Sequence, residues 1–203
     1  MKKKTDYLAT SIWYKLEITD AYQIIAEFFS TYNVSYVRKT MQQIIRSAYS
    51  DYVWAKGTPE DLLFNFEKLE SVINACFIIN REKKHSPIEV NSEQLFNRNL
   101  FRGWHANYTD WDEMPKFLSI KEYHDPYLGV RRFFKYKNVH EWKELLNKIL
   151  HYAFSSSSIL EEVANFDTLT VLDKLTRLIE ATHLIDVREN THIGGLLKNT
   201  RNR

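Results

Sequence analysis

An arginine and a histidine in the middle of the chain have residue types that could cleave RNA. Arg98 is followed by the polar Asn99, and His105 comes after six intervening residues. A guanidinium stabilises the charge that develops on a phosphate during its cleavage, and an imidazole can move the proton of a 2′-hydroxyl. Arg98 and His105 are therefore candidate catalytic residues for a metal-independent ribonuclease.

This stretch from Arg98 to His105 resembles the motif of HEPN-domain ribonucleases, which are all-helical proteins of similar size. The resemblance implies that Arg98 and His105 act on the scissile phosphate of RNA, often across a dimer. It covers this octet and the general helicity of the chain. The competing interpretation, which we favour, gives both residues ordinary surface and packing roles.

The same region carries two indoles beside charged side chains. Trp104 and Trp111 lie close in sequence to Arg102, Asp110 and Asp112. Such a group could bind a sugar ring, a base or a cationic ligand, so these five residues are candidate ligand-binding residues. The simpler interpretation, which we prefer, is that the two tryptophans cover an open end of the helical core.

Two polar residues, His183 and Asp186, fall on or beside the apolar face of a helix predicted over 167–188. Glu180, His183 and Asp186 follow one another at intervals of three residues. A di-iron bundle needs two Glu-x-x-His pairs and two further carboxylates, whereas this chain supplies one pair. We therefore expect no metal and no cofactor. The simpler interpretation is a structural polar contact, in which an imidazolium could pair a buried carboxylate, or exposure of these residues near the frayed end of the helix.

A basic stretch with aromatic residues is a weaker candidate for nucleic-acid binding. Bases interleaved with aromatic rings can hold a single strand. The simpler interpretation is an amphipathic helix whose aromatics face inward and whose bases face water. The residues concerned are Arg131, Arg132, Phe133, Phe134, Lys135, Tyr136 and Lys137.

Composition excludes several classes of protein. Six of the 28 basic residues lie among the first four and last six residues, so the body of the chain, with its 26 acidic residues, is slightly acidic. This balance disfavours a dedicated nucleic-acid domain. Cys76 stands alone, which excludes an internal disulfide and suits a reducing cytoplasm. The sequence has no Gly-rich phosphate loop, zinc spacing, signal peptide or transmembrane run.

Apolar periodicity predicts an all-α protein, a single-domain antiparallel bundle of five to six main helices. The 203 residues contain 5 Gly and 4 Pro, too few for a turn-rich sheet. We expect an ambiguous N-terminal arm over 1–18, an irregular capping segment over 85–118 and a flexible polar tail over 189–203. Helix starts are predicted at Asp20, Ser35, Thr58, Ser119 and Asn138.

The periodicity also predicts how the helices pack. Gly57 is expected to end the second helix, whose inner face should include Tyr52 and Ala55, and to make the second and third helices antiparallel neighbours. The apolar arc of 167–188 is wide, so this helix should be enclosed on several sides.

The function expected from the sequence is a soluble, cytoplasmic and non-catalytic one. Abundant Tyr and Trp favour protein–protein contacts, with an unknown protein partner or self-association, and no membrane. A HEPN-like ribonuclease using Arg98 and His105 is the alternative, and nucleic-acid binding through Arg131 and Arg132 is weaker still. RNA is thus a less favoured partner.

Overall fold

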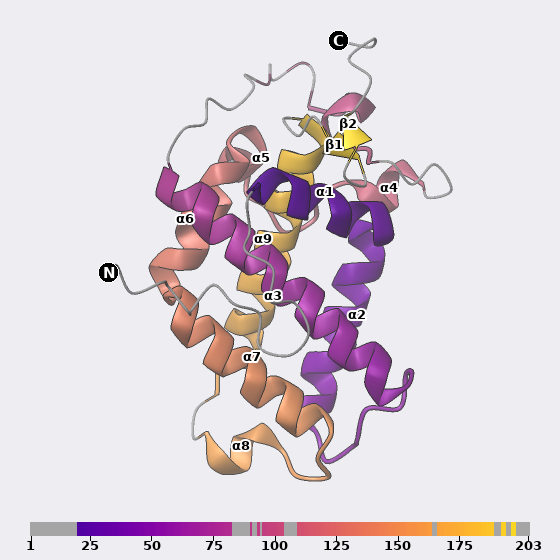
Figure 1. The fold of residues 1–203 in the computed structure, drawn as a ribbon, viewed down its shortest axis with the longest axis vertical. Coiled ribbons are helices and arrows are strands. Elements are labelled where there is room, and N and C mark those ends of the chain that lie inside the picture. The colour runs from indigo at the N-terminus through magenta and orange to yellow at the C-terminus, as the bar shows by residue number, and fades with distance from the viewer. Residues whose placement is uncertain are drawn as a thin grey trace.

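A computed structural model describes residues 20–82, 90, 93, 95–103, 109–163, 166–188, 192–193 and 196–197. Within these ranges the fold is an all-α bundle, as predicted (Figure 1). The six long helices are α1 (Ala21–Thr31), α2 (Val34–Tyr49), α3 (Pro59–Glu82), α6 (Pro126–Tyr136), α7 (Val139–Ala153) and α9 (Thr168–Arg188). The short elements are η3 (Arg98–Leu100), α4 (Asp110–Glu113), α5 (Ile120–His124), α8 (Ile159–Glu162), β1 (His192–Ile193) and β2 (Leu196–Leu197).

Side-chain caps begin several helices where the sequence predicts a start. The Asp20 carboxylate accepts the backbone N–H groups of Tyr22 and Gln23 at the start of α1. Ser119 with Glu122, and Asn138 with Glu141, form complete capping boxes at α5 and α7. These bonds satisfy N–H groups that the first helical turn leaves unpaired.

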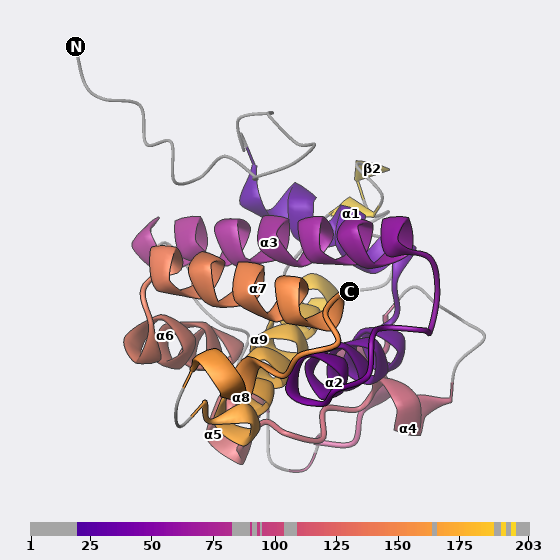
Figure 2. The ribbon, with the colours of Figure 1, turned by 90° about the horizontal axis from the view of Figure 1, so that it is seen from below.

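Helix α9 lies in the middle of the bundle, with α3 and α7 on one side, α6 on another and α2 opposite α6 (Figure 2). Every residue from Leu178 to Asp186 is buried, so this part of the helix is covered all round. The predicted enclosure is therefore confirmed. The first turn protrudes, and Leu169, which the periodicity assigns to the inner face, is 80% exposed.

The predicted antiparallel pairing of α2 and α3 is wrong. Helix α2 packs on α7 and α9, whereas α3 packs on α1 and runs antiparallel to α7 (Figures 1 and 2). Helix α2 ends at Tyr49, well before Gly57, and both Tyr52 and Ala55 are exposed. The reason is Trp54, which is buried and whose backbone N–H donates to the Ala153 carbonyl at the end of α7 (2.8 Å).

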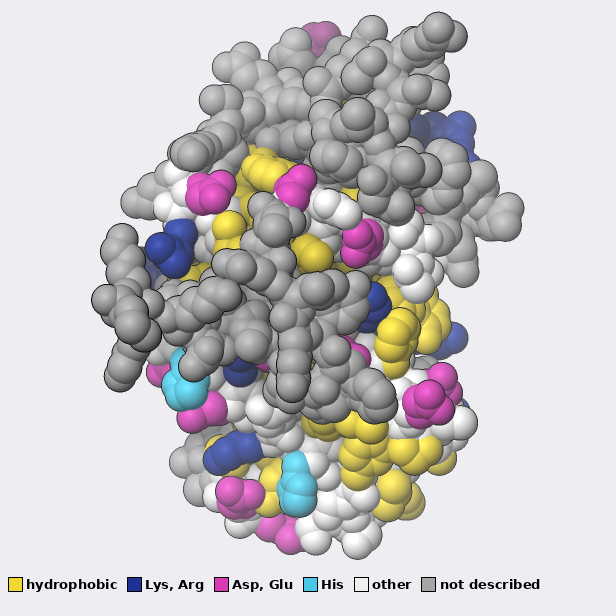
Figure 3. Space-filling view, in the orientation of Figure 1, with side chains coloured by type: hydrophobic (Ala, Val, Ile, Leu, Met, Phe, Trp, Pro, Cys, Tyr) yellow, Lys and Arg dark blue, Asp and Glu magenta, His cyan; other side chains and the backbone are white. Residues whose placement is uncertain are grey.

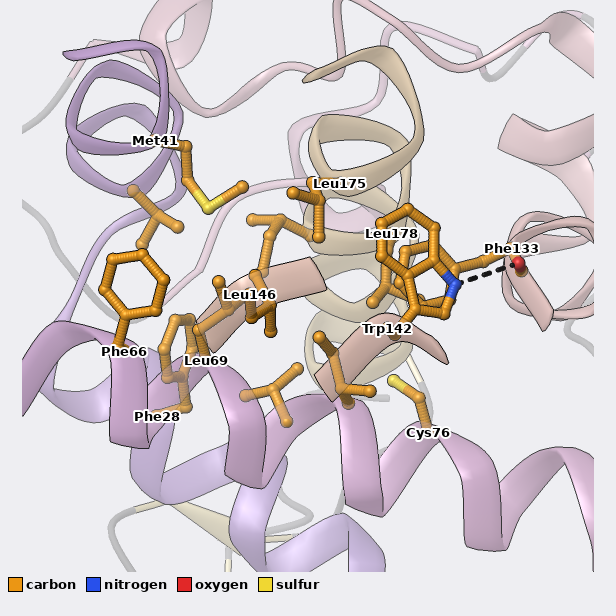
Figure 4. Packing of buried hydrophobic residues seen from close by; sticks show 14 of the residues in the cluster. Phe28, Met41, Phe66, Leu69, Cys76, Phe133, Trp142, Leu146, Leu175 and Leu178 are labelled. Carbon is orange, nitrogen blue, oxygen red and sulfur yellow. Dashed lines mark hydrogen bonds between the residues drawn. The ribbon is translucent and has the colours of Figure 1, made fainter. Parts of the chain in front are cut away.

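One continuous apolar cluster fills the bundle and takes side chains from all six long helices. Trp142 stacks on Phe133 with ring centroids 4.1 Å apart, and its indole N–H donates to the Phe133 carbonyl (Figure 4). Cys76 is completely buried, with its sulfur 3.2 Å from the Thr182 hydroxyl. Burial raises the pKa of this thiol to about 12, so it stays protonated.

The described part of the segment between α3 and α5 covers the C-terminal half of α9. A second, smaller apolar cluster lies beneath it, formed by Val90, Phe101, Tyr123 and Leu184. The tail contains an unexpected element, because β1 and β2 pair as a two-residue antiparallel ladder. Among the described residues, no helix is both long and apolar enough to cross a membrane.

Candidate functional site

A buried ion pair joins α9 to α2 and to the segment that covers α9. Arg38 Nη1 of α2 donates to Glu180 Oε1 of α9 across 2.6 Å, and both side chains are almost fully buried. Arg38 also donates to the backbone carbonyls of Met114 (3.1 Å) and Asp112. Its charge is therefore matched by one carboxylate and two peptide dipoles.

The Glu180 carboxylate also binds three consecutive backbone N–H groups. Oε1 accepts the N–H of Lys116 at 2.9 Å, and Oε2 accepts those of Phe117 and Leu118 at 2.8 and 3.2 Å. Three adjacent, partly buried N–H groups are thus satisfied by a single side chain. Glu180 fixes the course of the chain just before α5.

His183, one turn further along α9, holds the preceding part of the segment. Its Nε2 lies 2.9 Å from the Phe101 carbonyl and 3.8 Å from Glu113 Oε2, which in turn accepts the Gly103 N–H at 2.6 Å. Glu180 and His183 therefore bind different partners, although the sequence places them on one helix face. Asp186 is also buried. The described residues contain no cluster of three or more His, Cys, Asp or Glu that could hold a metal ion.

Arg98 and Arg102 converge on a single carboxylate. Arg98 Nε lies 2.7 Å from Asp110 Oδ2, and Arg102 Nη1 lies 3.2 Å from Asp110 Oδ1. His105 and Trp104 lie outside the described residues, so a joint action of Arg98 and His105 on RNA stays a prediction. Asp112 accepts the Thr109 hydroxyl (2.6 Å) at the start of α4, which is a local structural role.

Trp111 is 68% exposed, so the interpretation of this residue as a cover for the core is wrong. On the single turn of α4, Glu113 is the buried residue, and side chains two positions apart point to nearly opposite sides of a helix. The apolar cover is supplied by Phe101 and Met114 instead. The Lys116 ammonium lies 5.0 Å from the centre of the Trp111 rings.

The basic stretch of α6 is amphipathic, as its simpler interpretation states, except that the aromatic ring of Tyr136 does not face inward. Phe133 is buried, Phe134 is partly buried, and Tyr136 stays exposed beneath Lys137. The two arginines differ, because Arg131 pairs with Asp125 on the surface whereas Arg132 pairs with the buried Glu122 (2.9 Å).

A feature that the sequence did not reveal is an apolar slot between α2 and α3. Because these helices are held apart by the packing of α7, their facing side chains leave a narrow opening with the end of α1. In Figure 4, Met41 of α2 and Phe66 of α3 both extend into this side of the core. The slot is lined by Phe28, Tyr32, Tyr36, Val37, Thr40, Met41, Ile44, Asn65, Phe66 and Leu69.

Aromatic rings form the rim of the slot. Tyr36 stacks on Tyr32, with ring centroids 5.6 Å apart and planes only 6° from parallel. Burial, helped by the charges of Tyr36 and Asp61, raises the pKa of Tyr32 to about 12. Tyr36 and Phe64 are each 46% exposed. Both hold large apolar surfaces in contact with water.

The lining of the slot contains no charged residue, but the two helices beside it differ in the charges that they expose elsewhere. Helix α2 contains no acidic residue, and its Lys39 and Arg46 are exposed. Helix α3 begins with the exposed acids Glu60 and Asp61. A surface with an apolar centre, one basic side and one acidic side is complementary to itself after a twofold rotation.

Comparisons with protein-family models, with curated proteins and with solved structures found no match for this chain. The geometry of its own residues therefore carries the functional argument.

Proposed function

We propose that this protein acts by binding other proteins, and that a second copy of the chain binds over the slot between α2 and α3. The observation that carries this proposal is the exposed ring of Tyr36 at an apolar opening, together with the exposed ring of Phe64 on α3, the helix that forms the other side of the opening. Exposed aromatic residues beside an apolar recess are typical of protein interfaces.

The surface around the slot extends along the connection between α2 and α3. Tyr52 and Val53 are exposed there, and hydrophobic side chains gather over this connection at the lower right of Figure 3. Tyr36 is held by its stack on Tyr32, and the Lys68 ammonium lies 5.3 Å from the centre of the Phe64 ring. Rings that are already held lose little conformational freedom when a partner covers them.

Charge favours a second copy as the occupant. In a twofold contact, Lys39 and Arg46 of one chain would face the acidic start of α3 of the other, at Glu60 and Asp61. The same surface would then serve both chains, as in most homodimers. A strongly basic or strongly acidic partner would leave one side of the slot facing like charge.

The oligomeric state in solution tests this proposal. We expect a dimer by light scattering and by sedimentation at about 50 µM protein, above the Kd of a micromolar complex. Tyr36→Ser combined with Phe64→Ser should give a folded monomer, because both changes are at exposed positions. Added salt should weaken the dimer through the charges beside the slot.

The matched control is Phe96→Ser, which removes an exposed ring from another part of the chain and should leave the dimer intact. A wild-type protein that stays monomeric at this concentration would contradict the proposal. So would a dimer that survives the double substitution.

A further inference from the structure

A second opening, separate from the slot, lies where α5, α6 and α9 meet. It has a volume of about 310 Å³, which is at the lower end of the range for small-molecule sites. Its lining contains three cations and two carboxylates. The residues are Glu122, Gly129, Arg132, Phe133, Asp173, Lys174 and Arg177.

The close approach of α6 and α9 creates this cleft. A Cβ added at Gly129 would lie 2.9 Å from the Ala181 Cβ, so only glycine allows the two helices to come this near. Arg132 follows Gly129 by one turn and Arg177 precedes Ala181 by one turn, which brings both guanidinium groups to the same place. Each Nη1 lies 2.9 Å from one oxygen of the Glu122 carboxylate.

The carboxylates of the cleft are already occupied by the protein's own donors. Glu122 is 1% exposed, and besides the two arginines it accepts the N–H (2.9 Å) and the hydroxyl (2.6 Å) of Ser119. Both oxygens of Asp173 accept Arg177 Nε, at 2.7 and 2.9 Å. These two acids orient the guanidinium planes and offer few sites to a cation.

Donors remain on the cationic side. Arg132 Nη2 and Arg177 Nη2 have no partner among the described residues, and Lys174 approaches Asp173 only to 3.9 Å. The Arg132 side chain is also 46% exposed to solvent. This cleft contains guanidinium groups fixed by carboxylates, an ammonium group and few available acceptors, so it favours an anionic ligand. The paired N–H donors of a guanidinium group match the oxygens of a phosphate well.

We propose that this cleft binds the phosphate group of a small organic phosphomonoester. The volume fits a small molecule, and the buried carboxylate holds the arginines in place before the ligand arrives. The binding site is independent of self-association through the slot.

Thermal unfolding and calorimetry with glucose 6-phosphate and with inorganic phosphate test the proposal, against sodium chloride at the same ionic strength. We expect both phosphates to raise the Tm, with the ester binding at least as tightly as the inorganic ion. Lys174→Met and Arg132→Met should each weaken phosphate binding about tenfold, the effect of one charge-assisted hydrogen bond. Lys174→Met should fold normally, because both contacts of its ammonium are long, at 3.9 Å from Asp173 and 5.9 Å from the centre of the Tyr136 ring.

Arg131→Met is the matched control, since it removes the same charge from the neighbouring residue, which pairs with Asp125 outside the cleft. It should leave phosphate binding unchanged. Equal losses in Arg131→Met and Arg132→Met would show nonspecific screening and overturn the proposal. Stabilisation by single-stranded RNA but by neither small phosphate would overturn it in favour of nucleic-acid binding.

Discussion

Glu122 keeps an ionised carboxylate at a position that is almost closed to water. Burial alone would raise its pKa, but hydrogen bonds from Ser119 and the charges of Arg132 and Arg177 outweigh burial and lower the pKa to about 2. The ordinary value is 4.5. The folded state therefore gains stability from the ionised form at neutral pH.

This lowered pKa predicts an acid-dependent loss of stability. The contribution of Glu122 is fully present above about pH 4.5 and is lost as the pH falls through about 2, since the unfolded chain takes up the proton first. A shift of this size corresponds to roughly 3 kcal/mol. Urea unfolding between pH 2.5 and 6 should show that the advantage of the wild type over Glu122→Gln shrinks with acid. A difference independent of pH would contradict this explanation.

Local signals in the sequence were sufficient to predict where several helices begin. The capping residues Asp20, Ser119 and Asn138 act within a few residues of their own position, so their pattern can be read from the chain. The end of α2 could not be predicted in this way. It depends on Trp54, which reaches the end of α7 about a hundred residues later in the sequence.

The contact between α6 and α9 depends on one missing side chain. Gly129→Ala should lower the free energy of unfolding by about 1–2 kcal/mol. The energy lost through the clash with the Ala181 Cβ should exceed the energy that alanine usually gains over glycine in a helix. Denaturant unfolding measures this loss, and Ala181→Gly in the same chain should recover part of it.

Gly57→Ala is the control for that substitution. A Cβ at Gly57 would meet the Asp61 carboxylate at 3.1 Å, but this side chain is exposed and can move. The change should therefore have little effect. Equal losses at both glycines would argue against a special role for the α6–α9 contact.

The candidate sites were the part of the molecule that sequence reasoning anticipated least. Arg38 and Glu180 are 142 residues apart, and neither has a local pattern that names the other as its partner. The slot likewise depends on which helices pair, because it exists only where α2 and α3 fail to close on each other. In contrast, the amphipathic character of α6, with Phe133 buried and Arg131 and Arg132 exposed, follows from the spacing of its apolar residues and was predicted.

The pairing of Arg38 with Glu180 ties α2, α9 and the covering segment into one structure. Glu180→Gln should lower the free energy of unfolding by about 3–5 kcal/mol, because it leaves the buried Arg38 guanidinium without its counter-charge. It also places an amide N–H group where the carboxylate accepted hydrogen bonds from backbone N–H groups. Thermal and urea unfolding would measure the loss. Arg38→Met in the same chain should make the combined cost smaller than the sum of the two single changes.

Glu144→Gln serves as the reference, because Glu144 lies on the surface and pairs with the exposed His140. Its cost should stay within about 0.5 kcal/mol. If the two glutamine variants were equally stable, Glu180 would not have the structural role described above.

The central position of α9 also determines the order in which the protein can be completed during translation. Helices α1 to α8 leave the ribosome before α9, yet several of them place their inner faces against it. A nascent chain that ends before residue 168 therefore lacks the surface on which α1, α2 and α6 settle. Until that stretch emerges, we expect the apolar faces of these helices to stay exposed and to be prone to contact with neighbouring chains.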